Sequence, residues 1–185
     1  MKAIGKLLVI ALALAALGCA ERVEEQDTGG VLLEVEFVDT VFRVGVNDGD
    51  LVSLETVTIN SVVPNSTQPT SQLMDVQLNT VELVYTRADT GTTVPPPLVY
   101  NVVGTVPVGG QLTYTGLPIM SSDQLDRPPL SDLLFQNGAI DRETGQTTIR
   151  INVTIRVYGE TVGGTDVASI PRTQTFEFVP TLVTN

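Results

Sequence analysis

The sequence contains no histidine and no tryptophan, and Cys19 is its one cysteine. A single cysteine cannot form a disulfide within the chain, and zinc sites built from cysteine and histidine ligands are excluded. Catalytic triads that use a histidine base are excluded as well. Aromatic residues make up only 5% of the chain, which argues against a carbohydrate-binding module that stacks sugars on aromatic rings.

Positive charge is also scarce. The formal net charge is −11, with 10 lysines and arginines against 21 aspartates and glutamates. Both lysines, Lys2 and Lys6, lie at the start of the chain, and the arginines that follow are scattered. Nucleic-acid binding needs a basic stripe that displaces counterions, so we expect no nucleic-acid partner. Docking on anionic headgroups through a polybasic patch is excluded for the same reason.

The beginning of the chain has the pattern of an export signal. Lys2 and Lys6 precede an unbroken apolar run from Leu7 to Leu17. This run is too short to span roughly 30 Å of membrane hydrocarbon, but it matches the apolar core of a signal peptide. Gly18 and Cys19 follow it directly. An ordinary signal peptide with a chance cysteine is the alternative interpretation.

The segment Leu14-Ala15-Ala16-Leu17-Gly18-Cys19 resembles the lipobox of bacterial lipoproteins. In that family the cysteine thiol takes a diacylglyceryl group, cleavage occurs just before the cysteine, and the new amine is acylated. The segment departs from the family at Ala16, where leucine is usual. The resemblance implies that acylated Cys19 anchors the protein in a lipid bilayer of the cell envelope. Ala20, where aspartate would favour the inner membrane, implies the outer membrane.

We expect four regions along the chain. The signal peptide occupies residues 1–18, and the lipidated cysteine with a flexible tether occupies residues 19–30. The tether is acidic and ends in two glycines, so it cannot bury an apolar face. Residues 31–180 are long enough to form one domain with a real core. Residues 181–185 form a C-terminal tail.

Alternation of apolar and polar residues predicts an all-β domain. The clearest case runs from Ile149 to Val157, where every second residue is isoleucine or valine. The residues between them are polar, so the segment has one apolar and one polar face, which indicates a half-buried antiparallel strand. In another run the apolar parity switches between Leu78 and Val81, which predicts a β-bulge. Including that run, the further strands are expected near residues 33–37, 51–63, 75–86, 98–106, 111–114 and 173–179.

About seven short strands separated by turn signals predict an immunoglobulin-like antiparallel β-sandwich, with a small β-barrel as the alternative. One segment, near residues 121–137, interrupts the strand pattern. Ser121 and Gln124 fit a capping box. A second short helix is predicted from Pro129 to Gln136, with Asn137-Gly138 as its C-cap. We expect these pieces to form a helical insertion across one end of the sandwich.

Two acidic patterns are candidate chemical sites. The tripeptide Asp-Thr-Gly, which aspartic proteases use in pairs, begins at Asp27 and at Asp89. Asp27 lies in the expected tether and Asp89 fits a hairpin tip, so we interpret both as turn residues. Asn47, Asp48 and Asp50 are a weak calcium candidate, because an EF-hand-type loop needs more carboxylates and a distal glutamate. We therefore expect no catalytic residues, no cofactor and no metal.

Two further segments each have two interpretations. Pro95-Pro96-Pro97 could dock in an aromatic groove as polyproline II, although a stiff loop is favoured. Leu130, Leu133, Leu134 and Phe135 could form a partner-binding face, although helical spacing of this kind usually indicates core packing.

The leading hypothesis for function is a lipid-anchored, non-catalytic structural or accessory module of the cell envelope, with an envelope protein as its partner. A ligand-binding or adhesion module is the first alternative. A hydrolase comes third; without histidine it would depend on a carboxylate pair drawn from residues such as Asp123, Asp126 and Asp132.

Overall fold

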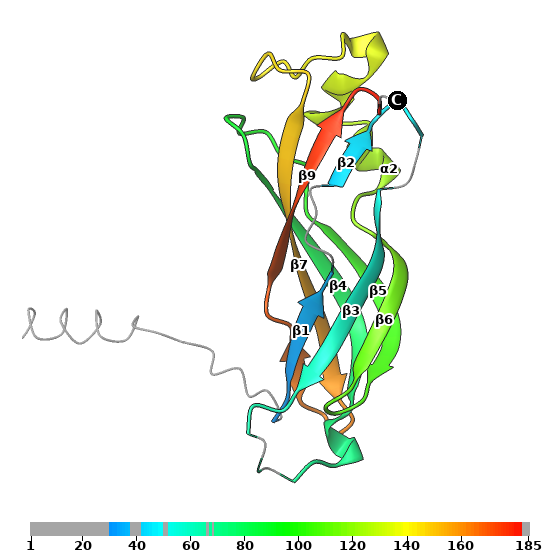
Figure 1. Ribbon diagram of the computed structural model, residues 1–185, viewed down its shortest axis with the longest axis vertical. Helices are drawn as coiled ribbons and strands as arrows, with labels where there is room; N and C mark the ends of the chain where they lie inside the picture. The colour runs from blue at the N-terminus through cyan, green and yellow to red at the C-terminus, as the bar shows by residue number, and fades with distance from the viewer. Residues whose placement is uncertain (1–29, 38–41, 50–51, 66, 68, 183–185) are drawn as a thin grey trace, which may run out of the picture.

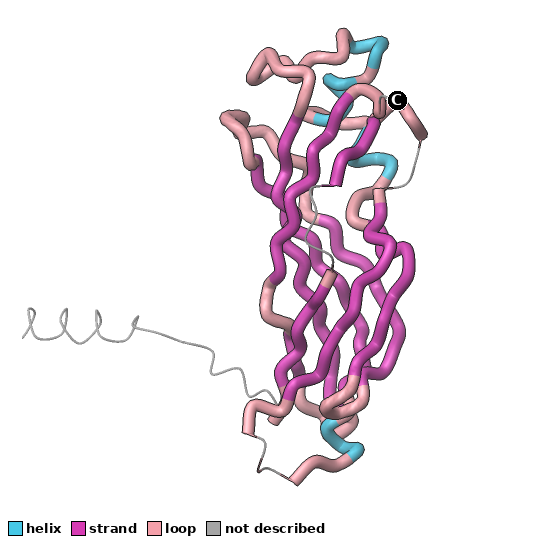
Figure 2. Tube along the Cα trace, in the orientation of Figure 1, coloured by secondary structure: helices cyan, strands magenta, loops and turns pink. Residues whose placement is uncertain are grey.

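The computed structural model describes residues 30–37, 42–49, 52–65, 67 and 69–182. The expected signal peptide, Cys19, Asp27 and Asp50 lie outside these residues, as does the expected tether up to residue 29. The described part is an elongated arrangement of strands with short helical turns at its ends (Figures 1 and 2). None of its helices is both long and apolar enough to cross a membrane.

The strands of the described part form two sheets, so the all-β prediction is confirmed. The smaller sheet, sheet A, has the order β1 (Leu32–Glu36), β3 (Ser53–Val62), β6 (Gln111–Pro118). The larger sheet, sheet B, has the order β2 (Phe42–Gly45), β9 (Arg172–Val179), β7 (Ile149–Thr161), β4 (Val76–Arg87), β5 (Leu98–Val106), and β8 (Asp166–Ala168) also pairs with β7.

The connectivity is that of an immunoglobulin-like sandwich. Strands β1, β3 and β6 take the places of A, B and E, and strands β9, β7, β4 and β5 take those of G, F, C and C′. The chain crosses from sheet A to sheet B between β1 and β2. Strand β2 therefore runs parallel to β9, and the expectation of a wholly antiparallel sandwich is wrong at this one pair.

Strand β7 lies in the middle of sheet B and carries much of the core. Five apolar side chains at alternate positions from Ile149 to Val157 are fully buried, while the residues between them are partly or fully exposed. Burial of each such side chain contributes about 1.5–3 kcal/mol. The period-two pattern of the sequence thus identifies the central strand of sheet B, which pairs with β9 on one side and β4 on the other.

The β-bulge predicted in β4 is present. Its register with β5 and with β7 shifts between Leu78 and Thr80. Because the bulge inserts one residue, Leu78 and Val81 both face the core despite their opposite parity.

The sequence pattern does not predict β2 or β8, which have 4 and 3 residues. Strands β8 and β9 pair with successive parts of β7, and Ser169-Ile170-Pro171 separates them. Pro171 has no N–H to donate to the ladder. The N–H of Ile170 donates instead to the carbonyl of Leu33 in β1, at 2.9 Å. This interruption of the last strand joins the edge of sheet A to sheet B.

Helical turns lie at both ends of the sandwich. The 3-10 turn η1 (Gln72–Met74) lies between β3 and β4, at the end where β1 begins. At the opposite end, α2 (Ser122–Leu125) starts with the predicted capping box (Figure 1). There the N–H of Gln124 donates to Ser121 Oγ, and the N–H of Ser121 donates to Gln124 Oε1.

The single helix predicted over Pro129–Gln136 is wrong. The chain forms two 3-10 turns, η2 (Leu130–Leu133) and η3 (Phe135–Asn137), with Leu134 extended between them. Gly138 has a φ of 103° and ends η3, as expected for a C-cap. Leu130 and Leu133 are buried in the core, whereas the side chain of Phe135 is 62% exposed.

Side-chain hydrogen bonds explain why this helix is broken. The side-chain amide of Asn47 donates to the carbonyl of Leu133 at 3.2 Å, and its oxygen accepts from the N–H of Phe135 at 3.2 Å. The amide of Asn137 donates to the carbonyl of Ser131 at 2.7 Å. A continuous helix would use these backbone groups within itself.

Candidate functional site

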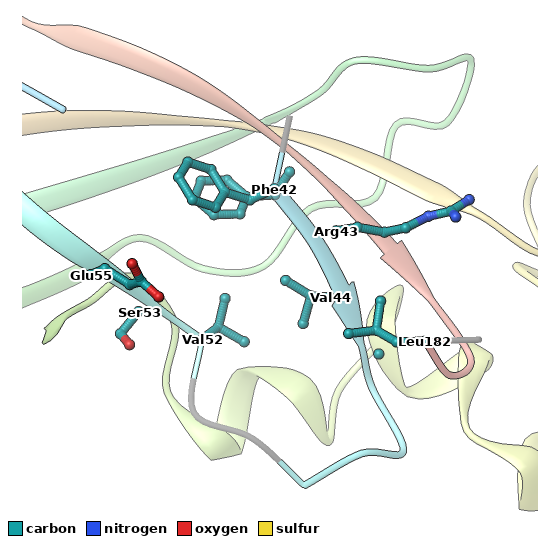
Figure 3. A pocket seen from close by; sticks show the side chains of 9 residues that line it. Phe42, Arg43, Val44, Val52, Ser53, Glu55 and Leu182 are labelled. Carbon is teal, nitrogen blue, oxygen red and sulfur yellow. The ribbon is translucent and has the colours of Figure 1, made fainter. Parts of the chain in front are cut away.

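A groove opens between the two sheets beyond the end of β1. Strand β1 pairs with Thr58–Val62 of β3, and this ladder stops at Glu36. In the described residues, Ser53–Val57 therefore has a strand partner on one side only, namely β6. Across from it, β2 is the edge strand of sheet B. The groove between these two edges has a volume of about 460 Å³ (Figure 3).

Apolar side chains form the floor of the groove. The ring of Phe42 in β2 stacks on that of Phe176 in β9, with centroids 5.3 Å apart and planes 20° from parallel. Phe176 is buried, but Phe42 and Val44 are only half-buried. Val52 and Leu182 complete the lining (Figure 3). The inward face of β2 is thus partly uncovered, as expected for an edge strand that lacks a neighbour.

Charged side chains lie at the rim. Arg43 Nη2 is 3.1 Å from Glu177 Oε1, so its charge is already paired. Arg150 lies on the other oxygen of Glu177, at 3.8 Å. Glu55, by contrast, is exposed and makes no ion pair within the described part of the chain. The groove therefore presents one unpaired negative charge.

Backbone groups on both walls point into the groove. The N–H of Val46 donates to the carbonyl of Val179, at 2.9 Å, and thus toward β9. Because backbone groups alternate in direction along a strand, those of Arg43 point to the open side of β2. On the other wall, the carbonyl of Val52 accepts from Ile119, so the same alternation directs the backbone of Ser53 toward the groove.

The calcium candidate lies next to the groove, and the structure gives two of its residues other partners. The Asn47 side chain is hydrogen-bonded to the backbone of Leu133 and Phe135. Its amide also donates to the carbonyl of Pro180 at 2.7 Å. Asp48 accepts from the Thr181 hydroxyl and, at 2.9 Å, from the N–H of Leu182. The Thr181 hydroxyl and then the Leu182 N–H lower the pKa of Asp48. Asp50 lies outside the described residues.

No group of three or more acidic or cysteine side chains in the described part is placed to hold a metal ion. We expect millimolar calcium to leave the melting temperature unchanged, because both carboxylate oxygens of Asp48 already accept hydrogen bonds. A ligand at 100 times its dissociation constant would add about 2.7 kcal/mol and shift melting by several degrees. A rise of that size, abolished by Asp48→Ala and retained by the exposed control Asp126→Ala, would contradict this prediction. Differential scanning fluorimetry measures it.

Asp89, the second Asp-Thr-Gly aspartate, belongs to a buried charge cluster. The side chain of Arg87 is only 3% exposed; its Nε donates to Asp89 at 2.7 Å and its Nη2 donates to Asp141 at 2.7 Å. The Asp141 side chain is 1% exposed. Asp89 also accepts from the N–H of Gly91, at 2.9 Å, which makes it the expected turn residue. The sequence alone does not indicate Asp141.

The carboxylates of this cluster are held in the ionised form. Burial acts to raise the pKa values of Asp89 and Asp141, but hydrogen bonds from Arg87 and neighbouring groups outweigh it, so both pKa values are lowered. Hydrogen bonds from the Thr92 hydroxyl and the Thr93 and Thr92 N–H groups lower the pKa of Glu143 to about 2. A general acid or base works best with a pKa near the operating pH. The arrangement instead ties the loop after β4 to the loop before β7.

The remaining candidates lie apart from the groove or face solvent. The amide of Gln124 donates to the carbonyl of Pro96 at 2.6 Å, which fixes the three-proline loop against α2. Asp123 pairs with Arg127 on the surface. Buried Asp132 lies 3.4 Å from the guanidinium of Arg142.

The sequence pattern does not single out Phe42 and Val44, although a signal for them exists. Phe42, Val44 and Val46 alternate with Arg43, Gly45 and Asn47. Four residues are too few for that alternation to stand out from a loop.

In comparisons with known proteins, no family model matches the chain, and it matches neither a curated protein nor a solved structure.

Proposed function

We propose that this protein is a lipid-anchored, non-catalytic module of the bacterial cell envelope, a structural or accessory subunit of a membrane-associated assembly. The observation that carries the proposal is the lipobox-like segment ending at Cys19. Two or more acyl chains hold a protein at a bilayer far more firmly than one. Ala20 favours the outer membrane as the site of anchoring.

The arrangement of the domain supports anchoring from its N-terminal side. Strand β1 begins at one end of the sandwich, and α2 lies at the other (Figure 1). The groove lined by β2 is nearer the α2 end. A tether attached before β1 would direct the α2 end, and the groove near it, away from the bilayer. A partner could then reach the groove.

The state of the carboxylates supports a non-catalytic role. Asp89, Asp141 and Glu143 hold loops through short hydrogen bonds, and their pKa values are lowered. None of the three is prepared to donate a proton near neutral pH.

A ligand-binding or adhesion module is the second candidate, and the groove is the observation that favours it. A partly apolar groove with open strand edges suits recognition of a partner better than small-molecule chemistry.

Intact mass of protein extracted from membranes tests the anchoring. We expect a chain that begins at Cys19 and carries added acyl mass. Cys19→Ser should block processing at this position, because an oxygen cannot form the thioether. A water-soluble chain with a free thiol at Cys19, or one that begins elsewhere, would be incompatible with the proposal.

A further inference from the structure

We infer that the groove between β2 and β3 binds an extended segment of a partner protein, which adds to the free edge of β2 as a further strand of sheet B. The inference rests on the proposed role as a module of an assembly and names the chemistry of its partner. The segment would alternate apolar residues with polar ones and carry a lysine or arginine.

The free edge of β2 requires a partner with its own backbone donors and acceptors. The N–H and C=O of Arg43 point away from β9, and no strand of the described part pairs with that side of β2. Unpaired backbone groups next to an apolar floor are costly, and an added strand satisfies them. An apolar small molecule would leave them unpaired.

Side-chain chemistry defines the inward face of the segment. In an added strand, every second side chain would point toward the space between the sheets, beside the half-buried Phe42 and Val44. Val52 lies on the opposite wall of this space, and Leu182 lies beside Gly45 at the end of β2. Valine or isoleucine at the inward positions of the added segment would bury the exposed parts of Phe42 and Val44.

Charge defines one further residue of the segment. Arg43 is already paired with Glu177, while Glu55 on the β3 wall has no ion pair within the described part. The chain as a whole carries a net charge of −11. A basic residue in the segment would pair with Glu55, and an acidic segment would be repelled.

Strand β2 is the better edge for pairing, because β3 is irregular where it faces the groove. Leu54 and Val57 are both buried although they differ in parity, and Glu55 and Thr56 between them are both exposed. Opposite Glu55, Gly116 of β6 has a φ of 70°. Four residues of β2 span about 13 Å at 3.3 Å per residue, enough for one short strand.

The test uses the full chain purified in detergent and the peptide acetyl-Thr-Val-Lys-Val-Thr-Val-Lys-amide, measured by titration calorimetry and amide hydrogen exchange. We expect saturable binding with slower exchange at Arg43. Arg43→Pro removes the free-edge N–H while leaving the groups that face β9, and it should weaken binding about tenfold or more. Val103→Ala, on β5 at the other edge of sheet B and 91% exposed, is the control and should bind as the parent does.

Two peptide controls make the result independent of how well Arg43→Pro folds. The same peptide N-methylated at every second residue keeps its side chains but loses backbone donors, so it should not bind the unaltered protein. Replacing both lysines with glutamates should weaken binding. Equal binding of the N-methylated peptide, or no binding of the parent peptide, would overturn the inference. Acylation at Cys19 is measured separately by mass, so a lipidated protein that ignores the peptide would refute the groove inference alone.

Discussion

Val157→Asp should leave the protein unfolded, or lower its free energy of unfolding by about 4–5 kcal/mol or more, the range of the most severe single substitutions. Val157 is 0% exposed in β7, the middle strand of sheet B. Its neighbour across the ladder to β4 is Val81, which is also fully buried. A carboxylate there has no partner and must either stay charged in the core or bind a proton, and both states cost several kcal/mol.

The choice of position matters, because Ile151 is equally buried but less informative. Ile151 lies opposite Arg87 in the ladder with β4, and the guanidinium could pair with a new carboxylate. Thr154→Asp is the matched control: it lies on the same strand, is half-buried on the outer face, and faces Val84 and Thr173. Circular dichroism and urea unfolding at neutral pH should show a folded control and an unfolded or severely weakened Val157→Asp. A loss below about 1 kcal/mol, typical of surface positions, would mean that β7 does not occupy the core.

This contrast also shows how much of the fold could be predicted from the sequence. In β7 and β4 each residue's environment follows from the parity of its position, so local alternation was enough to place the strands and even the bulge after Leu78. Strand β2 has only four residues, and it is a strand because of a pairing with β9 more than 130 residues away. No window of the sequence contains that information.

The prediction of one continuous helix within the insertion fails for a related reason. Leucine spacing over Pro129–Gln136 suits a helix, and Leu130 and Leu133 are buried as that spacing predicts. The helix is broken by Asn47, which lies 86 residues from Leu133 in sequence. The groove also depends on pairing between segments that are far apart in sequence. It exists because β1 and β2 pair with different sheets. The sequence around these two strands shows only two short apolar runs and does not indicate which sheet each run joins.

The second large effect is expected at the buried charge cluster, where Arg87→Met should lower the free energy of unfolding by about 3–5 kcal/mol, the usual cost of leaving a buried charge unpaired. The Arg87 and Asp141 side chains are 3% and 1% exposed and only 2.7 Å apart. Methionine fills similar space but leaves Asp141 without its cation. The pair joins β4 to a loop 54 residues away, and the sequence alone does not predict it.

A surface ion pair provides the matched control. Arg127 and Asp123 form a pair of similar length, but their side chains are 60% and 67% exposed. Arg127→Met should therefore cost only about 0.3–0.5 kcal/mol, because water screens exposed pairs. Adding Asp141→Asn to Arg87→Met should recover part of the lost stability, since it removes the unpaired charge. Equal losses for Arg87→Met and Arg127→Met would show that the Arg87 cluster is not buried.

The pH dependence gives an independent check on the same cluster. The pKa values of Asp89 and Asp141 are lowered in the folded protein: burial acts to raise them, and Arg87 with the other donors outweighs it. Their stabilisation is present above the unfolded aspartate pKa of about 3.9 and is lost as the pH falls through the folded values. In Arg87→Met the pKa of Asp141 should rise, so that acid relieves the unpaired charge. The gap in unfolding free energy between the parent and Arg87→Met should thus narrow as the pH falls from about 7 to 3. A gap that stays constant over this range would mean that Arg87 stabilises the fold by packing rather than by charge.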